Sequence, residues 1–330
     1  MGNRTKPPLS ETSATLISTN GLSGIIEYDP SEYTFTAFAG TPLTEIHSAL
    51  AEKGQYLPCA PLLRDAGATL GGSIASGLSG PERFRYGGLR DFLLGIQFIA
   101  GDGSLHRAGG QVVKNAAGFD LPKFFVGSLG RFGILTEVTF KVFPAPTNTL
   151  TLKTPCSSPE DALESIVLAS ASRWELNAID YHPEHSSLYL QLGGPLSAIE
   201  IIAREIQSTF PDSIVHDESI WNSIRELTIF PRDTSIVKIP LTPKTIPSLQ
   251  SSLSEIPDAT AHYSVGGNLA LLATSDLSEL STLLESRHLQ GMTIQAPPGS
   301  SLWLGTSDSF AIHAALKSTL DPQKRFPPLS

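Results

Sequence analysis

Small residues dominate one short segment of the chain, residues 68–81, which reads ATLGGSIASGLSGP. Glycines in such a segment let the backbone approach a ligand closely, and successive free N–H groups in its bends form a concavity that binds anions. Four hydroxyl groups are further donors to a pyrophosphate: those of Thr69, Ser73, Ser76 and Ser79. The same composition also fits an ordinary glycine- and serine-rich surface loop, so the segment by itself leaves both interpretations open.

The common nucleotide-binding motifs are absent from the sequence. It contains no G-x-x-x-x-G-K-[ST] run, so a P-loop is not indicated. It also has no G-x-G-x-x-G run after a predicted strand, which argues against a Rossmann domain. A phosphate-binding segment at 68–80 would therefore belong to another architecture.

The first half of the chain alternates predicted strands, glycine loops and short helices. Residues 33–37 and 134–142 alternate as half-buried strands do, and the apolar run 92–100 predicts a buried strand that ends in the tight turn 101–103. A helix should follow Thr41 as its cap, with Pro42 in its first turn and Gly54 at its end. His47 would then be a packed or boundary residue, and Asp120 would cap another short helix. The run PAP at 144–146 breaks the pattern, and we place a domain boundary there, between 1–146 and 147–330.

The second half has an α+β pattern without a glycine fingerprint. Ser158, Pro159 and Asp161 form a capping pattern before an apolar helix. The predicted helices are 161–171, 197–210, 219–227 and 277–287, and the predicted strands are 179–181, 188–192, 235–239 and 269–273. An arginine of this domain, such as Arg225 or Arg232, could clamp a carboxylate, but a core Trp221 and surface charges that include Lys238 fit equally well.

Composition excludes several classes of protein. A net charge of −9 argues against binding nucleic acid through its phosphates. Cys59 and Cys156 form neither a C-x-x-C pair nor a Cys/His set, so neither a disulfide framework nor a zinc site is indicated. The sequence has no apolar run of the roughly 18–20 residues that a membrane span needs, and its N-terminus lacks an apolar signal core. We expect a cytoplasmic protein, with membrane association only through partners.

An ordered series of motifs resembles the FAD domain of the vanillyl-alcohol-oxidase and cresol-methylhydroxylase (PCMH) type. The series comprises GTPL at 40–43, ATLGG at 68–72, RYGGLRD at 85–91, GGQVVKNAAGFDL at 109–121, GSLG at 127–130 and GILTEV at 133–138. The segment 109–121 is the decisive one, because it resembles the G-x-V-x-K-N-x-x-G-[YF]-D-L segment of the FAD-binding subunits of bacterial glycolate oxidase. The resemblance is strong from about 24 to 146 and weaker beyond.

The resemblance implies an α+β fold, with a PCMH-type FAD-binding domain followed by an α+β substrate or cap domain. It also implies noncovalent FAD, because no histidine or cysteine stands where relatives attach the flavin. The implied FAD-binding residues are Ala68, Thr69, Gly71, Gly72, Ala75, Ser79, Gly87, Asp91, Lys114, Gly133, Ile134 and Val138. Lys114 would place positive charge near the flavin; the alternative is a surface lysine paired with Asp120.

Residues 2–6, GNRTK, resemble the first phosphate loop of this family and add Thr5 and Lys6 to the implied site. The lobe that precedes this loop in relatives is expected to be missing here, through truncation or a start codon assigned downstream.

Relatives that oxidise 2-hydroxy acids often carry a metal-linked run H-P-x-G-D-G-N-L-H. Here the segment 262–270 reads HYSVGGNLA, with Gly267 where a carboxylate would stand and Ala270 where the last histidine would stand. A divalent metal needs several such ligands, so we predict no metal site. His182 and His185 form an H-x-x-H pair in a proline-containing segment, and we expect them to be solvated loop residues.

The leading hypothesis is the FAD-binding subunit of a glycolate oxidase or dehydrogenase complex, which would oxidise the small 2-hydroxy acid glycolate to glyoxylate. The resemblance implies two partners, a second flavoprotein subunit and an iron–sulfur subunit. Loss of the metal run favours a role in electron relay or assembly, with little glycolate oxidation by the chain alone. The alternatives are a self-sufficient FAD-linked oxidoreductase for another hydroxy acid or alcohol, and a flavin-free scaffold.

Overall fold

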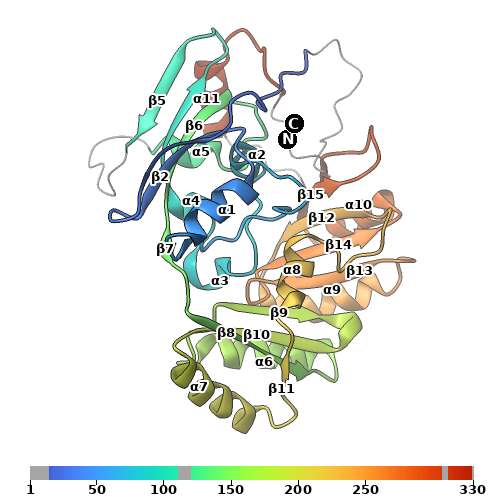
Figure 1. The fold of residues 1–330 in the computed structure, drawn as a ribbon. Coiled ribbons are helices and arrows are strands. Elements are labelled where there is room, and N and C mark those ends of the chain that lie inside the picture. Colours follow the sequence, from blue (N-terminus) through green and yellow to red (C-terminus); the bar gives the residue numbers. More distant parts are fainter. Residues whose placement is uncertain (1–14, 111–119, 307–310, 329–330) are drawn as a thin grey trace.

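The computed structural model describes residues 15–110, 120–306 and 311–328, which form two α+β units, one above the other in Figure 1. Three of the implied FAD-binding residues, Thr5, Lys6 and Lys114, lie outside these described residues. None of the helices in the described part is long and apolar enough to cross a membrane.

The first unit is built on a five-stranded antiparallel sheet with the strand order β1-β2-β6-β4-β5. Its strands are β1 (Ile25–Asp29), β2 (Thr34–Phe38), β4 (Leu93–Ile99), β5 (Leu105–Gly109) and β6 (Ile134–Lys141). The strands predicted at 33–37, 92–100 and 134–142 are therefore confirmed, as is the turn after β4, where Gly103 has a φ of +87°. Alternate residues of β2, such as Phe35 and Ala37, are fully buried and fix which face of the sheet meets the core.

Short helices and a two-stranded ribbon complete the first unit. They are α1 (Leu43–Ala51), α2 (Leu70–Ser76), α3 (Arg83–Tyr86), α4 (Leu89–Phe92), α5 (Pro122–Phe125), β3 (Gln55–Tyr56) and β7 (Phe143–Pro144). Helix α1 was predicted, and Gly54, at φ +64°, follows its end. The predicted cap was wrong: the buried Thr41 hydroxyl bonds to the Phe38 carbonyl at 2.7 Å instead of to an α1 amide. Asp120 does not cap α5 either; its carboxylate pairs with Lys123 at 2.7 Å.

The second unit is built on a nine-stranded antiparallel sheet with the order β11-β8-β10-β9-β13-β14-β12-β15-β16. Its strands are β8 (Asn148–Pro155), β9 (Ala178–His182), β10 (Ser187–Gly194), β11 (Ile214–His216), β12 (Ser235–Pro240), β13 (Thr260–Ser264), β14 (Leu269–Thr274), β15 (Gln290–Gln295) and β16 (Trp303–Gly305). The four predicted strands correspond to β9, β10, β12 and β14. The sequence did not predict the other five strands, β8, β11, β13, β15 and β16.

Four helices cover one face of this sheet: α6 (Pro159–Ala171), α7 (Leu196–Thr209), α9 (Ile246–Leu253) and α10 (Leu277–Ser286). Helix α8 (Ser219–Arg225) lies on the other face, where Trp221 packs on Ala178 and Tyr189. Two 3₁₀ turns, η1 (Pro183–His185) and η2 (Pro243–Thr245), precede β10 and α9. The Ser158 hydroxyl caps α6 as predicted, by accepting from the Asp161 amide at 3.2 Å. Helices α6, α7, α8 and α10 were predicted, and α9 was not.

The two units share one hydrophobic cluster. From the second sheet, Ile236, Leu271 and Met292 join the cluster that contains the core of the first unit. The C-terminal helix α11 (Ala311–Leu320) also returns to the first unit, where the Leu320 carbonyl accepts from Gly101 at 2.8 Å. Further along, the Pro328 carbonyl accepts from the Arg131 guanidinium at 2.7 Å. The division at residue 146 falls between β7 and β8 and stays a prediction.

A cluster of buried polar groups lies on the face of the second sheet that carries α8. The His262 ring bonds to the Asp180 carboxylate at 2.7 Å, and both side chains are fully buried. The expectation that His182 is a solvated loop residue was wrong, because β9 extends to His182 and leaves it 2% exposed. Its ring stacks on His185 with 3.9 Å between centroids, and neither of its nitrogens has a hydrogen-bond partner in the described part of the chain.

Burial, together with the charges of His262, His185 and Lys153, lowers the pKa of His182 to about 3. Because the pKa of an unfolded histidine is about 6.5, the unfolded chain binds more protons between these two values. The free energy of unfolding should therefore decrease as the pH falls from about 6.5 towards 3, by at most about 1.4 kcal/mol per pH unit from this residue. In His182→Leu, this part of the decrease should disappear, as measured by urea unfolding across the pH range.

The matched control is His288→Asn, which removes an exposed histidine at a positive φ that asparagine tolerates. It should keep the pH dependence of the parent chain. Equal pH dependence in His182→Leu and in the parent chain would show that His182 does not stay neutral.

Candidate functional site

A cavity of about 160 Å³ lies between helix α2 and the start of strand β6. Five of the predicted FAD-binding residues line it: Gly71, Gly72, Ala75, Gly133 and Ile134. The remaining lining residues are Thr19, Ala39, Ser76, Ser128, Leu129, Gly130 and Leu135. The GSLG motif at 127–130 pointed to three of these, whereas no sequence pattern pointed to Thr19 or Ala39, which reach the cavity only through the fold.

Glycines bring backbone atoms to the wall of this cavity, because side chains there would collide with the protein. A Cβ atom on Gly71 would lie 2.7 Å from the Cβ of Ala39, and one on Gly133 would lie 2.7 Å from the Ile99 carbonyl oxygen. Gly130 has a φ of +76°, and a Cβ there would meet no atom within 4 Å. Glycine backbone thus forms part of the cavity wall, which permits close approach of a ligand.

The first backbone amides of α2 are not free, and the expectation that bends in 68–80 hold a diphosphate stays a prediction. The Leu70 and Gly71 amides donate to the carbonyl oxygens of Thr41 and Ala39, at 2.9 and 2.7 Å. The Thr69 hydroxyl caps the helix by accepting from Gly72 at 3.3 Å. The amide of Gly130, across the cavity, has no acceptor among the described residues.

The other predicted residues that the structure describes do not line this cavity. Thr69 is the cap described above, and Ala68 is buried beside it. The Ser79 hydroxyl accepts from the Leu89 amide at 3.1 Å, and the Asp91 carboxylate accepts from Gly88 at 2.8 Å, next to Gly87. Val138 is fully buried in the centre of the first sheet. Contact of these residues with FAD stays a prediction.

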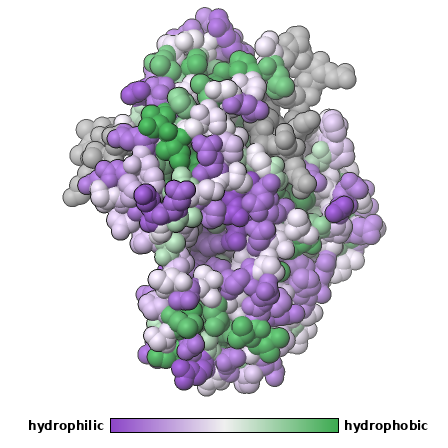
Figure 2. Space-filling model, viewed as in Figure 1, coloured by the Kyte–Doolittle hydropathy of each residue, from purple (hydrophilic) through white to green (hydrophobic). Residues whose placement is uncertain are grey.

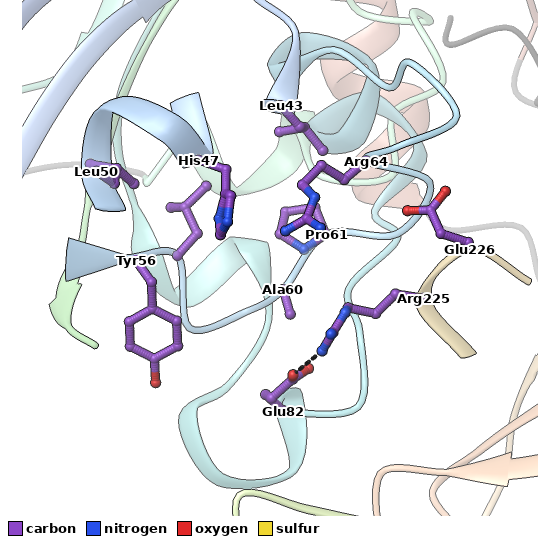
Figure 3. A pocket seen from close by; sticks show the side chains of 11 residues that line it. Leu43, His47, Leu50, Tyr56, Ala60, Pro61, Arg64, Glu82, Arg225 and Glu226 are labelled. Carbon is purple, nitrogen blue, oxygen red and sulfur yellow. Dashed lines mark hydrogen bonds and ion pairs between the residues drawn. The ribbon is translucent and has the colours of Figure 1, made fainter. Parts of the chain in front are cut away.

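A second cavity of about 200 Å³ lies at the junction of the two units (Figure 3). It shares no residue with the first cavity, and Figure 2 shows hydrophilic residues across this junction. Its lining is charged at one side, with Arg64 and Glu82 from the first unit and Arg225 and Glu226 from the end of α8. His47, at an exposed position of α1, also lines it.

The charges of the second cavity are mostly paired with one another. Arg225 donates to Glu82 at 2.5 Å, and the Glu226 carboxylate accepts from the backbone amides of Asp65 and Ala66 at 2.9 and 3.0 Å. Burial raises the pKa of Glu82 although Arg225 opposes the shift, and its second oxygen lacks a partner among the described residues. This arrangement fastens α8 to the first unit.

The segment 262–270 forms the turn between β13 and β14. Val265, Gly266 and Gly267 all have a positive φ there, and the side-chain NH₂ of Asn268 donates to the Val265 carbonyl at 3.0 Å. Among the described residues, no three histidine, cysteine or acidic side chains come together as metal ligands.

The first unit, with its glycine-lined cavity, is the part of the chain that carries the ordered glycine motifs. In agreement, residues 2–109 match the family model of the FAD binding domain. The chain thus contains an FAD-binding domain of the PCMH type, and FAD is its cofactor.

Among known proteins, glycolate oxidase subunit GlcE of Escherichia coli K12 is 44% identical over 156 residues, which are 47% of this chain and 43% of that protein. Glycolate oxidase subunit GlcD of Bacillus subtilis 168 is 28% identical over 57% of this chain and 41% of its own length. The matches thus span less than half of these relatives. Alkyldihydroxyacetonephosphate synthase has a similar fold, with a TM-score of 0.65 and 16% identity over 94% of this chain and 67% of that chain.

Replacing Ala75 by leucine should fill the cavity between α2 and β6. Ala75 is partly exposed there, so the larger side chain should displace the cofactor rather than strain the core. We expect the dissociation constant of FAD to rise at least about tenfold, which corresponds to about 1.4 kcal/mol, in a fluorescence titration of the full-length chain. Ala51→Leu, on the exposed face of α1, is the control and should leave the constant unchanged. Unchanged binding in Ala75→Leu would place FAD elsewhere.

Replacing Arg225 by methionine should leave the buried Glu82 without its partner. Removal of one partner of a buried pair costs about 3–5 kcal/mol, so the free energy of unfolding in urea should fall by about that amount. Arg64→Met, which breaks an exposed pair with Asp65 at the same cavity, should cost less than about 1 kcal/mol. Adding Glu82→Gln to Arg225→Met should recover most of the loss. Equal losses in the two arginine variants would contradict the buried-pair interpretation.

Proposed function

We propose that the chain is an FAD-dependent oxidoreductase that serves as the FAD-binding subunit of an assembly oxidising a small 2-hydroxy acid, glycolate in the first place. The observation that carries this proposal is the 44% identity to glycolate oxidase subunit GlcE over 156 residues. The names of other relatives support the substrate class, since they include D-2-hydroxyglutarate dehydrogenase and D-lactate dehydrogenase.

Within such a reaction, the residues that line the first cavity hold and orient the cofactor, and FAD supplies a hydride acceptor when bound. Gly71 and Gly133 allow close approach of the backbone, and Ala75 limits the width of the space. The docked second sheet keeps water from the inner side of the first unit, because Ile236, Leu271 and Met292 share its core.

We propose a role in electron relay or assembly rather than self-sufficient catalysis. The turn 262–270 offers His262, whose ring is already bonded to Asp180, and no further ligand for a metal. In the proposed assembly, a second flavoprotein subunit carries out the hydride step, and an iron–sulfur subunit accepts the electrons. The assembly is proposed to work in the cytoplasm, with any contact with a membrane made through its partners.

The test is anaerobic mixing of the full-length chain with glycolate, alone and after co-expression with its partner subunits. We expect the visible absorption band of its flavin to bleach rapidly only in the assembly. 2-Hydroxyisobutyrate, which has the carboxylate and hydroxyl but no hydrogen on C2, is the matched control and should not bleach the band.

Each alternative gives its own result in this experiment. Rapid bleaching of the isolated chain by glycolate or by another hydroxy acid would overturn the relay role and favour a self-sufficient oxidoreductase. A chain that holds no FAD, either alone or as a subunit of the assembly, would overturn the proposed function and favour a flavin-free scaffold.

A further inference from the structure

The second cavity, at the junction of the two units, has a size that selects small molecules. Its volume of about 200 Å³ equals that of roughly six or seven water molecules in the liquid. It therefore has room for an organic molecule of about that many non-hydrogen atoms, but not for a nucleotide. Because it shares no lining residue with the cofactor cavity, a ligand here need not displace one there.

The side of this cavity that α1 and the segment after it form is apolar. Leu43 and Leu50, two helical turns apart on one face of α1, are almost fully buried. Leu57 and Pro61 extend this surface along the following segment. These side chains offer contact to a short aliphatic chain and no hydrogen bond to a polar one.

Arg64 and His47 bring hydrogen-bond donors to the same cavity (Figure 3). Arg64 holds the Asp65 carboxylate through Nε, at 2.9 Å, and through Nη2, whereas its Nη1 has no acceptor in the described part of the chain. The His47 ring makes no hydrogen bond with any described residue. Burial, and next the charge of Arg64, lower the pKa of His47, so the ring is neutral at pH 7 and Arg64 carries the charge.

The acidic side chains of the lining are bound to other groups. Glu82 pairs with Arg225, and Glu226 accepts from two backbone amides of the first unit. Burial raises the pKa of Glu82, which reduces its repulsion of an anion. The second oxygen of Glu82 is completely buried, so a ligand in the cavity does not reach it. The described lining thus presents a cation to an anionic ligand and no free carboxylate oxygen to a hydroxyl group.

We propose that this cavity binds a short straight-chain monocarboxylate of about the length of pentanoate, which fills the available space. Its carboxylate accepts from Arg64, with His47 beside it, and its chain lies on Leu43, Leu50 and Leu57. Because the end of α8 also lines the cavity, the ligand contacts both units. The site binds this acid and does not oxidise it, so the inference goes beyond the proposed function and does not depend on it.

Isothermal titration calorimetry of the full-length chain with pentanoate at pH 7 tests the site. We expect a dissociation constant of about 1 mM or lower in the parent chain. It should rise at least about tenfold in Arg64→Met, which loses a charge-assisted hydrogen bond. Arg173→Met, which breaks an exposed pair with Glu205 in the second unit, is the matched control and should bind like the parent chain. Ala75→Leu should also bind pentanoate like the parent chain, although its binding of FAD is weakened.

The length and charge of the ligand give a second test, which needs only the parent chain. From acetate to pentanoate, each added methylene should tighten binding about fourfold, because it buries apolar surface. Octanoate should gain nothing beyond pentanoate, since the cavity is then full. 1-Pentanol, which has the chain without the charge, should bind at least about tenfold more weakly. 2-Hydroxypentanoate should bind about as tightly as pentanoate, because its hydroxyl group finds no free carboxylate.

Four results would overturn the inference. Absence of binding below about 10 mM pentanoate would show that the cavity holds no such acid. Equal binding in Arg64→Met and the parent chain would place the ligand elsewhere. Equal affinity for 1-pentanol would make the cavity a purely apolar gap. A preference of about tenfold or more for 2-hydroxypentanoate would make it a site for the substrate instead. If Arg64→Met does not fold, the ligand series in the parent chain decides alone.

Discussion

The cofactor cavity depends on the direct contact between helix α2 and the end of strand β2. Gly71 makes this contact possible, because any Cβ there would lie 2.7 Å from the Cβ of Ala39. In this contact the first amides of α2, those of Leu70 and Gly71, donate to the carbonyl oxygens of Thr41 and Ala39. The helix is thereby fixed as a wall of the cavity, and the donors left for a phosphate must come from other segments, such as the loop at Gly130.

Direct packing between elements also determines the junction of the two units. A sheet face that carries Ile236, Leu271 and Met292 completes the core of the first unit, while Arg225, Glu82 and Glu226 form the polar side of the junction. Apolar contact supplies most of the stabilisation in such an arrangement, and the buried ion pair fixes the relative position of the parts.

The sequence predicted the strands of the first sheet and four helices of the second unit, because their periodicity and caps are local signals. It also predicted five cavity residues from the ordered glycine motifs. It did not predict the environment of His182, since part of the burial there comes from His262 of β13, which is distant in the chain. The prediction that Thr41 caps α1 was wrong for a similar reason. Its hydroxyl bonds to Phe38 and Gly24, which are brought to it by the packing of β1 and β2. Local patterns cannot report such contacts.

The return of the C-terminal segment to the first unit has a consequence for how the chain acquires its structure. The Gly101 amide donates to the Leu320 carbonyl, and the Arg131 guanidinium donates to the Pro328 carbonyl. Because domains form as the ribosome delivers them, from the N-terminus onward, the first unit stays incomplete until residues 311–328 have been synthesised. Its sheet therefore forms before its last packing partner is available.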